Sequence, residues 1–194
     1  GKEVLMLDVG YESSKDSVLK NNKDISSSPK IRAPEFSYVF KDFNERYKIK
    51  STNFSSNGSL ARGGLSNAWS ALVSAFTDEE FEKFPFHRSE LLPHYNSVGK
   101  RIGISGDKTG DLINWLGNEY FIQENLPIHP LVKKLLQKYD ENKLKIHRYG
   151  IKLGRHNQAI LSIPHNNRPA FSEDAMHGYR DTSGAAYNAG DEIK

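Results

Sequence analysis

The 194-residue sequence contains no cysteine. This absence excludes disulfide bonds, thiolate metal sites, iron–sulfur clusters and cysteine nucleophiles. Long hydrophobic runs are also missing, and a membrane-spanning helix needs about 20 consecutive apolar residues. Neither sign of charge dominates, because the sequence has 27 Lys and Arg residues and 24 Asp and Glu residues, which gives a formal net charge of +3. We therefore expect neither a membrane span nor a nucleic-acid-binding protein with a concentrated basic face.

Aromatic side chains are abundant instead. The 10 Phe, 9 Tyr and 2 Trp residues are too many for a disordered chain. The length allows one domain, or one domain with a small appendage. The first residue is Gly rather than Met and an apolar run begins almost at once, so we interpret the chain as an internal fragment of a longer protein. Any N-terminal signal would then precede Gly1, and the lack of cysteine is consistent with a cytoplasmic protein.

The apolar run at residues 4–9 predicts a strand that is buried on both faces, as in a parallel sheet. Asp8 lies at the end of this run. An acidic residue that ends the second strand of a dinucleotide-binding unit accepts hydrogen bonds from the adenosine ribose. Two alternatives stay open: Asp8 forms only a turn, or the run is the first motif of S-adenosylmethionine-dependent methyltransferases. That motif has a second glycine where this sequence has Glu12.

Residues 11–57 predict a long insertion or connection, which is polar at first and then rich in aromatic residues. Phe36, Tyr38 and Phe40 alternate with other residues, which indicates an extended segment. The pattern favours aromatic rings that anchor the connection onto a core. The alternatives are stacking on nucleic-acid bases, or the contact surface of a non-catalytic carbohydrate- or partner-binding module over residues 36–54.

Caps, glycines and apolar periodicity predict several elements further along the chain. The capping box that begins at Thr77 starts a short helix that ends before Pro85. Apolar residues at helical spacing predict a helix over residues 90–102, with Gly103 as its stop. We also expect a short helix at 111–116, an extended piece within 120–128, a helix at 130–142, and strands at 145–153 and 158–163.

The most informative stretch is Gly63-Gly64-Leu65-Ser66-Asn67-Ala68-Trp69. Adjacent glycines permit positive φ angles and the close approach of a ligand to the backbone. The stretch resembles the Gly-Gly-x-Ser-x-x-Trp flavin-contact motif of pyranose oxidase and related glucose–methanol–choline (GMC) oxidoreductases. Residues 81–86 and 91–106 follow in the order of that family, with an acidic-aromatic-Pro stretch, a Leu-x-Pro-x-Tyr helix and an Ile-Gly-x-Ser-Gly end. The run at residues 4–9 is similar to the family's second strand.

The resemblance implies that FAD is the cofactor. Pyranose oxidase bonds its flavin covalently to a His immediately before the motif's Trp, and Ala68 at that position implies that FAD is bound non-covalently. The family's Gly-x-Gly-x-x-Gly turn would lie upstream of Gly1, and its catalytic His beyond Lys194, so no catalytic residue is assigned within the chain. The implied cofactor-binding residues are Asp8 at the adenosine ribose, Gly63, Gly64, Ser66 and Asn67 at the pyrophosphate or flavin, and Trp69 beside the ring system.

Other kinds of site have little support in the sequence. No pair among the seven histidines has the i, i+4 spacing of a zinc-binding helix, so we predict no metal site. His165 and His177 lie in a polar, glycine-rich region, where the alternatives are exposed loop residues and pocket-lining residues. No serine lies in a Gly-x-Ser-x-Gly elbow, which argues against a hydrolase.

The resemblance implies an α/β fold, of mixed α+β content in a fragment. Residues 1–104 would be part of a Rossmann-like FAD domain, and residues 105–194 part of a substrate-binding domain. The intact protein would oxidise a hydroxyl group of a sugar or other alcohol by hydride transfer to flavin. The electron acceptor stays open between oxygen, a quinone and a carrier protein. The fragment's core is expected to be incomplete unless missing parts or another copy cover it, which is compatible with a homo-oligomer.

Overall fold

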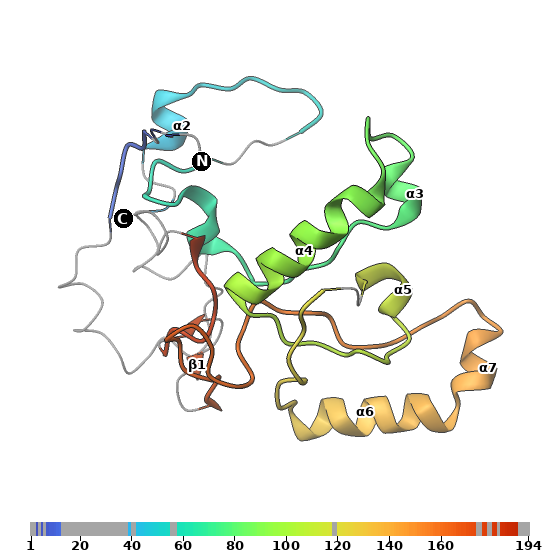
Figure 1. Cartoon of the computed structure of the whole chain (residues 1–194). Helices are drawn as coiled ribbons and strands as arrows, with labels where there is room; N and C mark the ends of the chain where they lie inside the picture. The colour runs from blue at the N-terminus through green and yellow to red at the C-terminus, as the bar shows by residue number, and fades with distance from the viewer. Residues whose placement is uncertain are drawn as a thin grey trace. The chain divides into compact units, whose positions relative to one another are not determined.

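The computed structural model describes residues 3, 5, 7–12, 39, 42–54, 58–117, 120–173, 176–177, 180–181 and 183–189. The chain divides into two compact units. Unit 1 comprises Gly1–Ser70, Asp174–Thr182 and Asn188–Lys194, and unit 2 comprises Ala71–Glu173 and Ser183–Tyr187. The predicted domain boundary at residue 104 lies inside unit 2, and the assignment of the two parts to domains of a larger enzyme stays a prediction. Figure 1 shows helices joined by long extended segments.

Unit 1 has little regular structure among its described residues. Tyr11 pairs in parallel with Ala61. The Tyr11 N–H donates to the Leu60 carbonyl at 3.1 Å, and the Arg62 N–H donates to the Tyr11 carbonyl at 2.9 Å. The regular elements of the unit are α2 (Phe43–Arg46), the 3₁₀ helix η3 (Gly64–Ala68) and the antiparallel hairpin of β1 (Met176–His177) and β2 (Arg180–Asp181), in which Met176 pairs with Asp181 and His177 with Arg180.

The predicted buried strand is not formed at the described positions of residues 4–9. Leu5 and Leu7 are exposed, and pairing in this region begins only at Tyr11. A parallel-sheet strand is buried only where other elements cover both of its faces, and the segment beside Tyr11 covers neither Leu5 nor Leu7. The extended segment predicted around Phe36, Tyr38 and Phe40, and most of the predicted connection at 11–57, lie outside the described residues.

Extended segments pair through isolated bridges at the centre of unit 2. Ser105 forms an antiparallel bridge with Gln158 and a parallel bridge with Gln123. Gln158 also pairs antiparallel with Leu72. These bridges match the strand predicted at residues 158–163 in part, because the backbone there is extended and paired without forming a regular strand. The side chains of Ser105, Asn157, Ala159 and Leu161 in these segments are almost completely buried.

Two predicted helices follow the paired segment that contains Leu72. They are α3 (Asp78–Phe81) and α4 (Arg88–Ile102). The capping box of α3 forms as expected, because Thr77 Oγ1 accepts the Glu80 N–H at 3.4 Å and Glu80 Oε2 accepts the Thr77 N–H at 2.7 Å. Gly103 ends α4 with a φ of +71°, and a Cβ there would lie 2.2 Å from Leu161 Cδ2. The positive φ and the close approach both require glycine at this helix end.

Three helices continue unit 2: α5 (Ile113–Leu116), α6 (Pro130–Glu141) and α7 (Lys143–His147). Pro130 lies in the first turn of α6, where its missing N–H needs no partner. The first two helices confirm the predictions at 111–116 and 130–142. The strand predicted over residues 145–153 is wrong, since its first residues belong to α7. A short alternation of apolar and basic residues fits a helical turn as well as a strand.

The regular elements of the described chain are mostly helices, and β1–β2 is the one regular sheet found within it. A Rossmann sheet is not seen in this part of the chain, so the α/β class stays a prediction. No helix among the described residues has the length and hydrophobicity needed to cross a membrane.

Candidate functional site

The paired glycines form a left-handed turn that opens into η3. Gly63 has a φ of +79° and Gly64 a φ of +60°. L-residues with a side chain rarely adopt these angles, so the turn depends on glycine. A Cβ built on Gly64 would meet no atom within 4 Å. The Cα of Gly64 therefore borders open space, while the Gly64 N–H donates to the Ala61 carbonyl at 2.8 Å.

Asp8 and Gly63, two of the residues predicted to bind the cofactor, lie together in the structure. Asp8 Oδ2 accepts the Gly63 N–H at 3.3 Å, and Asp8 Oδ1 accepts the Gly10 N–H at 2.7 Å. The pairing of Tyr11 with Ala61 brings these distant segments side by side. The Asp8 carboxylate therefore accepts hydrogen bonds from two backbone N–H groups, one of them at the start of the glycine turn.

The side chains of Ser66 and Asn67 donate hydrogen bonds to backbone carbonyls of the turn. Ser66 Oγ donates to the Gly63 carbonyl at 2.5 Å. Asn67 is only 6% exposed, and its Nδ2 donates to the carbonyls of Arg62 at 2.8 Å and Gly64 at 2.9 Å. Both side chains hold the turn in shape, so in this structure they position the backbone of the predicted site.

Trp69 follows η3 directly and is half-buried. Its backbone N–H donates to the Ser66 carbonyl at 3.2 Å and closes the 3₁₀ turn. The residue after it, Ser70, is the last of the first segment of unit 1. Trp69 therefore lies at the C-terminal end of η3, and the two glycines lie at its N-terminal end.

These residues fit the ribose and a flat ring of an FAD molecule better than they fit its phosphate groups. Each carboxylate oxygen can accept more than one hydrogen bond, so Asp8 retains acceptor capacity for ribose hydroxyls. The open space beside the Gly64 Cα fits a flat or extended group that lies against it. The N–H groups of both glycines already have acceptors, because Gly63 donates to Asp8 at 3.3 Å and Gly64 donates to the Ala61 carbonyl at 2.8 Å. A phosphate oxygen at either N–H would have to replace the present acceptor.

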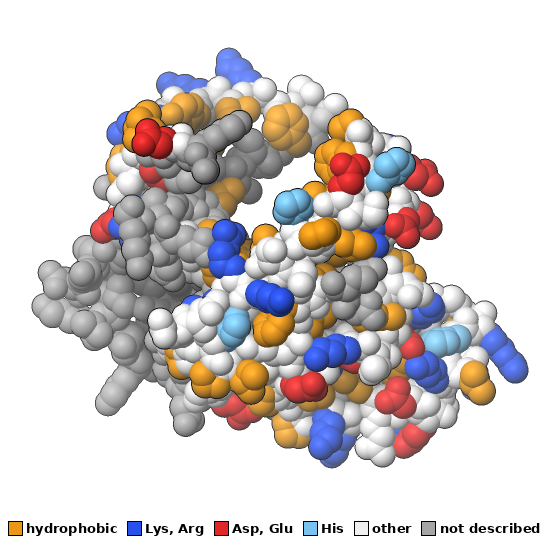
Figure 2. All heavy atoms as spheres, in the orientation of Figure 1, with side chains coloured by type: hydrophobic (Ala, Val, Ile, Leu, Met, Phe, Trp, Pro, Cys, Tyr) orange, Lys and Arg blue, Asp and Glu red, His pale blue; other side chains and the backbone are white. Residues whose placement is uncertain are grey.

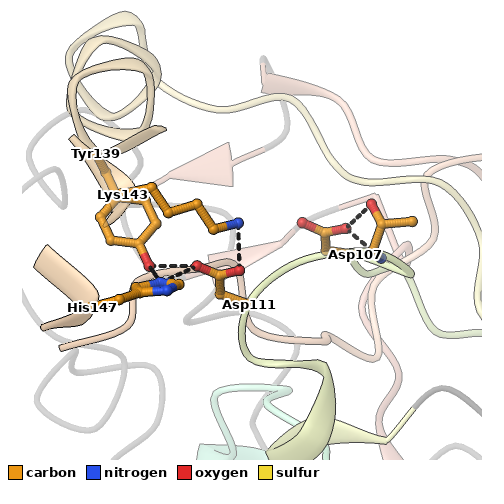
Figure 3. A network of polar contacts seen from close by, with 6 residues as sticks. Asp107, Asp111, Tyr139, Lys143 and His147 are labelled. Atoms are coloured by element: carbon orange, nitrogen blue, oxygen red, sulfur yellow. Dashed lines mark hydrogen bonds and ion pairs between the residues drawn. The ribbon is translucent and has the colours of Figure 1, made fainter. Parts of the chain in front are cut away.

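A second polar cluster, in unit 2, was not predicted from the sequence. Asp111 accepts hydrogen bonds or ion pairs from three side chains on α6 and α7, which point toward it in Figure 3. Lys143 Nζ lies 2.6 Å from Asp111 Oδ1, and the Tyr139 hydroxyl donates to Asp111 Oδ2 at 2.5 Å. His147 Nε2 lies 2.9 Å from Asp111 Oδ2 and 2.8 Å from the Tyr139 oxygen.

The electrostatics of this cluster favour the ionised carboxylate. The hydrogen bond from Lys143 and then that from Tyr139 hold the pKa of Asp111 well below its usual range. The same bond to Asp111 raises the pKa of Lys143. Burial, followed by the bond to Asp111, raises the pKa of Tyr139. At neutral pH the cluster is therefore a carboxylate held by an ammonium group and a neutral phenol.

The cluster connects α6 and α7 to the loop that carries Asp111. Its polar atoms are directed at one another, so we assign it a structural role. One signal for it is present in the sequence, because Tyr139, Lys143 and His147 recur at every fourth position, a spacing that places side chains on one helical face. Asp111, which lies 28 positions before Tyr139, carries no such signal.

A cavity of about 310 Å³ lies in unit 2 beside the first turn of α3. Its lining includes Phe76, Asp78, Arg88 and Asn114. Arg88 Nε donates to the Phe76 carbonyl at 2.9 Å and lies 3.7 Å from Asp78 Oδ1. None of the residues predicted to bind FAD lines this cavity.

The histidines singled out by the sequence have different positions. His165 Nε2 lies 2.5 Å from the Lys100 carbonyl, and its ring stacks on Phe121 at 5.3 Å. These contacts hold His165 against the end of α4. The side chain of His177 lies outside the described part of the structure. Within the described part, no group of three or more His, Asp or Glu side chains could hold a metal ion.

Comparison of the sequence with models of protein families finds no match, and comparison with curated proteins finds none either.

Proposed function

We propose that this chain is part of an FAD-dependent oxidoreductase similar to the GMC oxidoreductases, and that the intact protein oxidises a hydroxyl group of a sugar or other alcohol. The observation that carries the proposal is the contact between Asp8 and Gly63, next to the open space beside the Cα of Gly64. It unites an acidic residue suited to a ribose with a turn suited to a closely approaching ligand. The resemblance of the motif to a flavin-contact motif supplies the identity of the ligand.

The residues of this chain would bind and orient the cofactor. Asp8 would accept hydrogen bonds from the adenosine ribose, and Gly64 would let the cofactor approach the main chain. Ser66 and Asn67 would keep the turn in shape, and Trp69 would pack beside the ring system. When bound, FAD supplies the acceptor for the hydride that leaves the substrate carbon. The resemblance assigns no residue of this chain as the base for the hydroxyl proton, so we expect the chain alone to bind without turnover.

Binding of FAD in solution tests this proposal. We expect the 194-residue chain to raise the fluorescence anisotropy of FAD, and ADP to compete because it shares the ribose and diphosphate. We expect riboflavin, which lacks both, to bind more weakly. A chain that binds neither FAD nor ADP would contradict the proposal.

The second candidate function is a non-catalytic carbohydrate- or partner-binding module. Tyr47, Ile49 and Phe54 are exposed in the described part of residues 36–54, and exposed aromatic faces suit sugar rings. Retention on immobilised oligosaccharides without any binding of flavin would favour this function. The methyltransferase alternative gains no support, because Glu12 forms an ion pair with Arg62 at 2.8 Å where that motif has a glycine.

A further inference from the structure

The two consecutive helices α6 and α7 expose apolar side chains to solvent. Leu131 on α6 is 69% exposed, and Leu144 on α7 is 82% exposed. Leu135, Tyr149 and Ile151 are also exposed. The apolar face of α6 is therefore only partly used for packing: Tyr139 is buried within unit 2, whereas Leu131 and Leu135 face solvent. Isolated exposed leucines are ordinary, but a group of this size within α6, α7 and the turn that follows indicates a contact surface.

The same segment concentrates positive charge. Residues 130–152 contain seven Lys and Arg residues and two acidic residues, although the whole chain has a formal net charge of only +3. Two of these basic residues are paired, Lys143 with Asp111 and Lys138 with Glu141. The exposed basic residues that remain are Lys133, Lys134, Lys145 and Arg148, whereas the Lys152 ammonium group lies 4.7 Å from the centre of the Trp115 ring.

Basic and apolar side chains alternate along this surface. Leu131 and Leu135 are four positions apart, as are Lys134 and Lys138, and each lysine follows a leucine by three positions, so all four lie on one face of α6. The turn after α7 continues the mixture with Arg148 and Tyr149. Figure 2 shows blue and orange side chains next to each other over α7, with some acidic side chains among them.

We propose that the exposed face of α6 and α7 docks on the surface of an anionic lipid bilayer. A bilayer interface accepts separate apolar side chains between its headgroups, while Lys and Arg attract the lipid phosphates. A second copy of this chain would bring like charges together if the same face paired with itself. An apolar protein partner would require a continuous apolar patch, which the intervening lysines interrupt. This inference is independent of the flavin proposal.

Vesicle co-sedimentation of the full chain tests the proposal. We expect binding to vesicles of phosphatidylcholine with phosphatidylglycerol, weak binding to phosphatidylcholine alone, and a loss of binding as salt rises. The double variant Lys134→Gln/Arg148→Gln should bind about 25-fold more weakly, since each basic side chain near the surface contributes about fivefold. The variant Leu131→Ser/Leu144→Ser should also bind more weakly without any change in charge.

The double variant Lys48→Gln/Lys50→Gln is the matched control. Both lysines are exposed and belong to unit 1, so the same loss of charge should leave vesicle binding nearly unchanged. Thermal unfolding followed by circular dichroism shows whether each variant is folded. Absence of binding to anionic vesicles, or equal losses in both charge variants, would overturn the proposal. Binding to polyglutamate but not to vesicles would also overturn it and would indicate an acidic protein partner.

Discussion

The Asp8 carboxylate accepts the backbone N–H of Gly63 at 3.3 Å, across 55 positions of sequence. This contact joins the end of the first apolar run to the glycine turn. It rests on the pairing of Tyr11 with Ala61, which fixes the register of the two segments. The Asp8 carboxylate and the open space beside the Cα of Gly64 therefore border the same turn in unit 1.

Replacement of Asp8 by Asn should weaken both the turn and the binding of FAD. Asn retains one acceptor oxygen, but its NH₂ group would face one of the two N–H donors that now bond to the carboxylate. We expect a loss of about 1 kcal/mol in the free energy of unfolding and a weaker affinity for FAD. Urea unfolding and FAD titration measure the two effects. The exposed residue Glu3 provides a control, and Glu3→Gln should change neither quantity.

Replacement of Asn67 by Ala should destabilise unit 1. The part-buried carbonyls of Arg62 and Gly64 would both lose the Asn67 donor, and at about 0.5–1.5 kcal/mol for each hydrogen bond the two losses together cost about 1–3 kcal/mol. Urea unfolding should show this loss, whereas Asn53→Ala at an exposed position should stay close to the wild type. Equal stabilities of the two variants would show that Asn67 does not brace the turn.

The cap of α3 predicts a smaller effect in unit 2. Thr77→Ala removes the acceptor for the Glu80 N–H, and loss of such an N-cap typically costs about 1 kcal/mol. Ser89→Ala, in the exposed first turn of α4, is the control and should change stability by a few tenths of a kcal/mol at most. Calorimetric unfolding of both variants compares the two costs.

The Asp111 cluster predicts a dependence of stability on pH. Because the pKa of Asp111 is lowered on folding, its ionised form stabilises the folded state above the unfolded-state pKa of about 4. This contribution is lost progressively as the pH falls below that value. The raised pKa values of Lys143 and Tyr139 contribute stability that is present below about pH 10 and is lost at higher pH.

Urea unfolding of Asp111→Asn between about pH 3 and pH 7 tests this dependence. We expect the variant to be less stable than the wild type at pH 7, and the difference to shrink at acidic pH. Asp107→Asn is the matched control, since Asp107 belongs to the same loop and accepts the Thr109 N–H at 2.9 Å outside the cluster (Figure 3). A difference for Asp111→Asn that stays constant with pH would contradict the assignment.

Local signals in the sequence predicted local structure well. The capping box at Thr77, the stop at Gly103 and the start at Pro130 each depend on residues within one or two helical turns, and the helices they mark are present. The contact of Asp8 with Gly63 was not predicted, because the family resemblance implies a role at the cofactor for each residue but no hydrogen bond between them. Pairing between distant segments leaves no pattern in a single sequence.

The wrong predictions have physical causes as well. The residues from Lys145 on alternate between apolar and basic, but α7 leaves Leu144 exposed and uses Lys143 and His147 to reach Asp111. The contacts of Lys143 and His147 with Asp111 are tertiary interactions that the periodicity of the sequence does not report. The apolar run at residues 4–9 predicted burial, yet Leu5 and Leu7 are exposed because burial requires covering elements that the run itself does not specify.

The most direct test of the account is a titration of FAD into three proteins: the wild type, Gly64→Asn and Gly150→Asn. Both glycines have positive φ angles and open space where a Cβ would lie, and Asn tolerates such angles better than most residues. The two variants should therefore unfold alike. We predict that Gly150→Asn binds FAD as the wild type does and that Gly64→Asn binds at least about tenfold more weakly, a difference of about 1.4 kcal/mol. Unchanged FAD affinity in a folded Gly64→Asn variant would contradict the account.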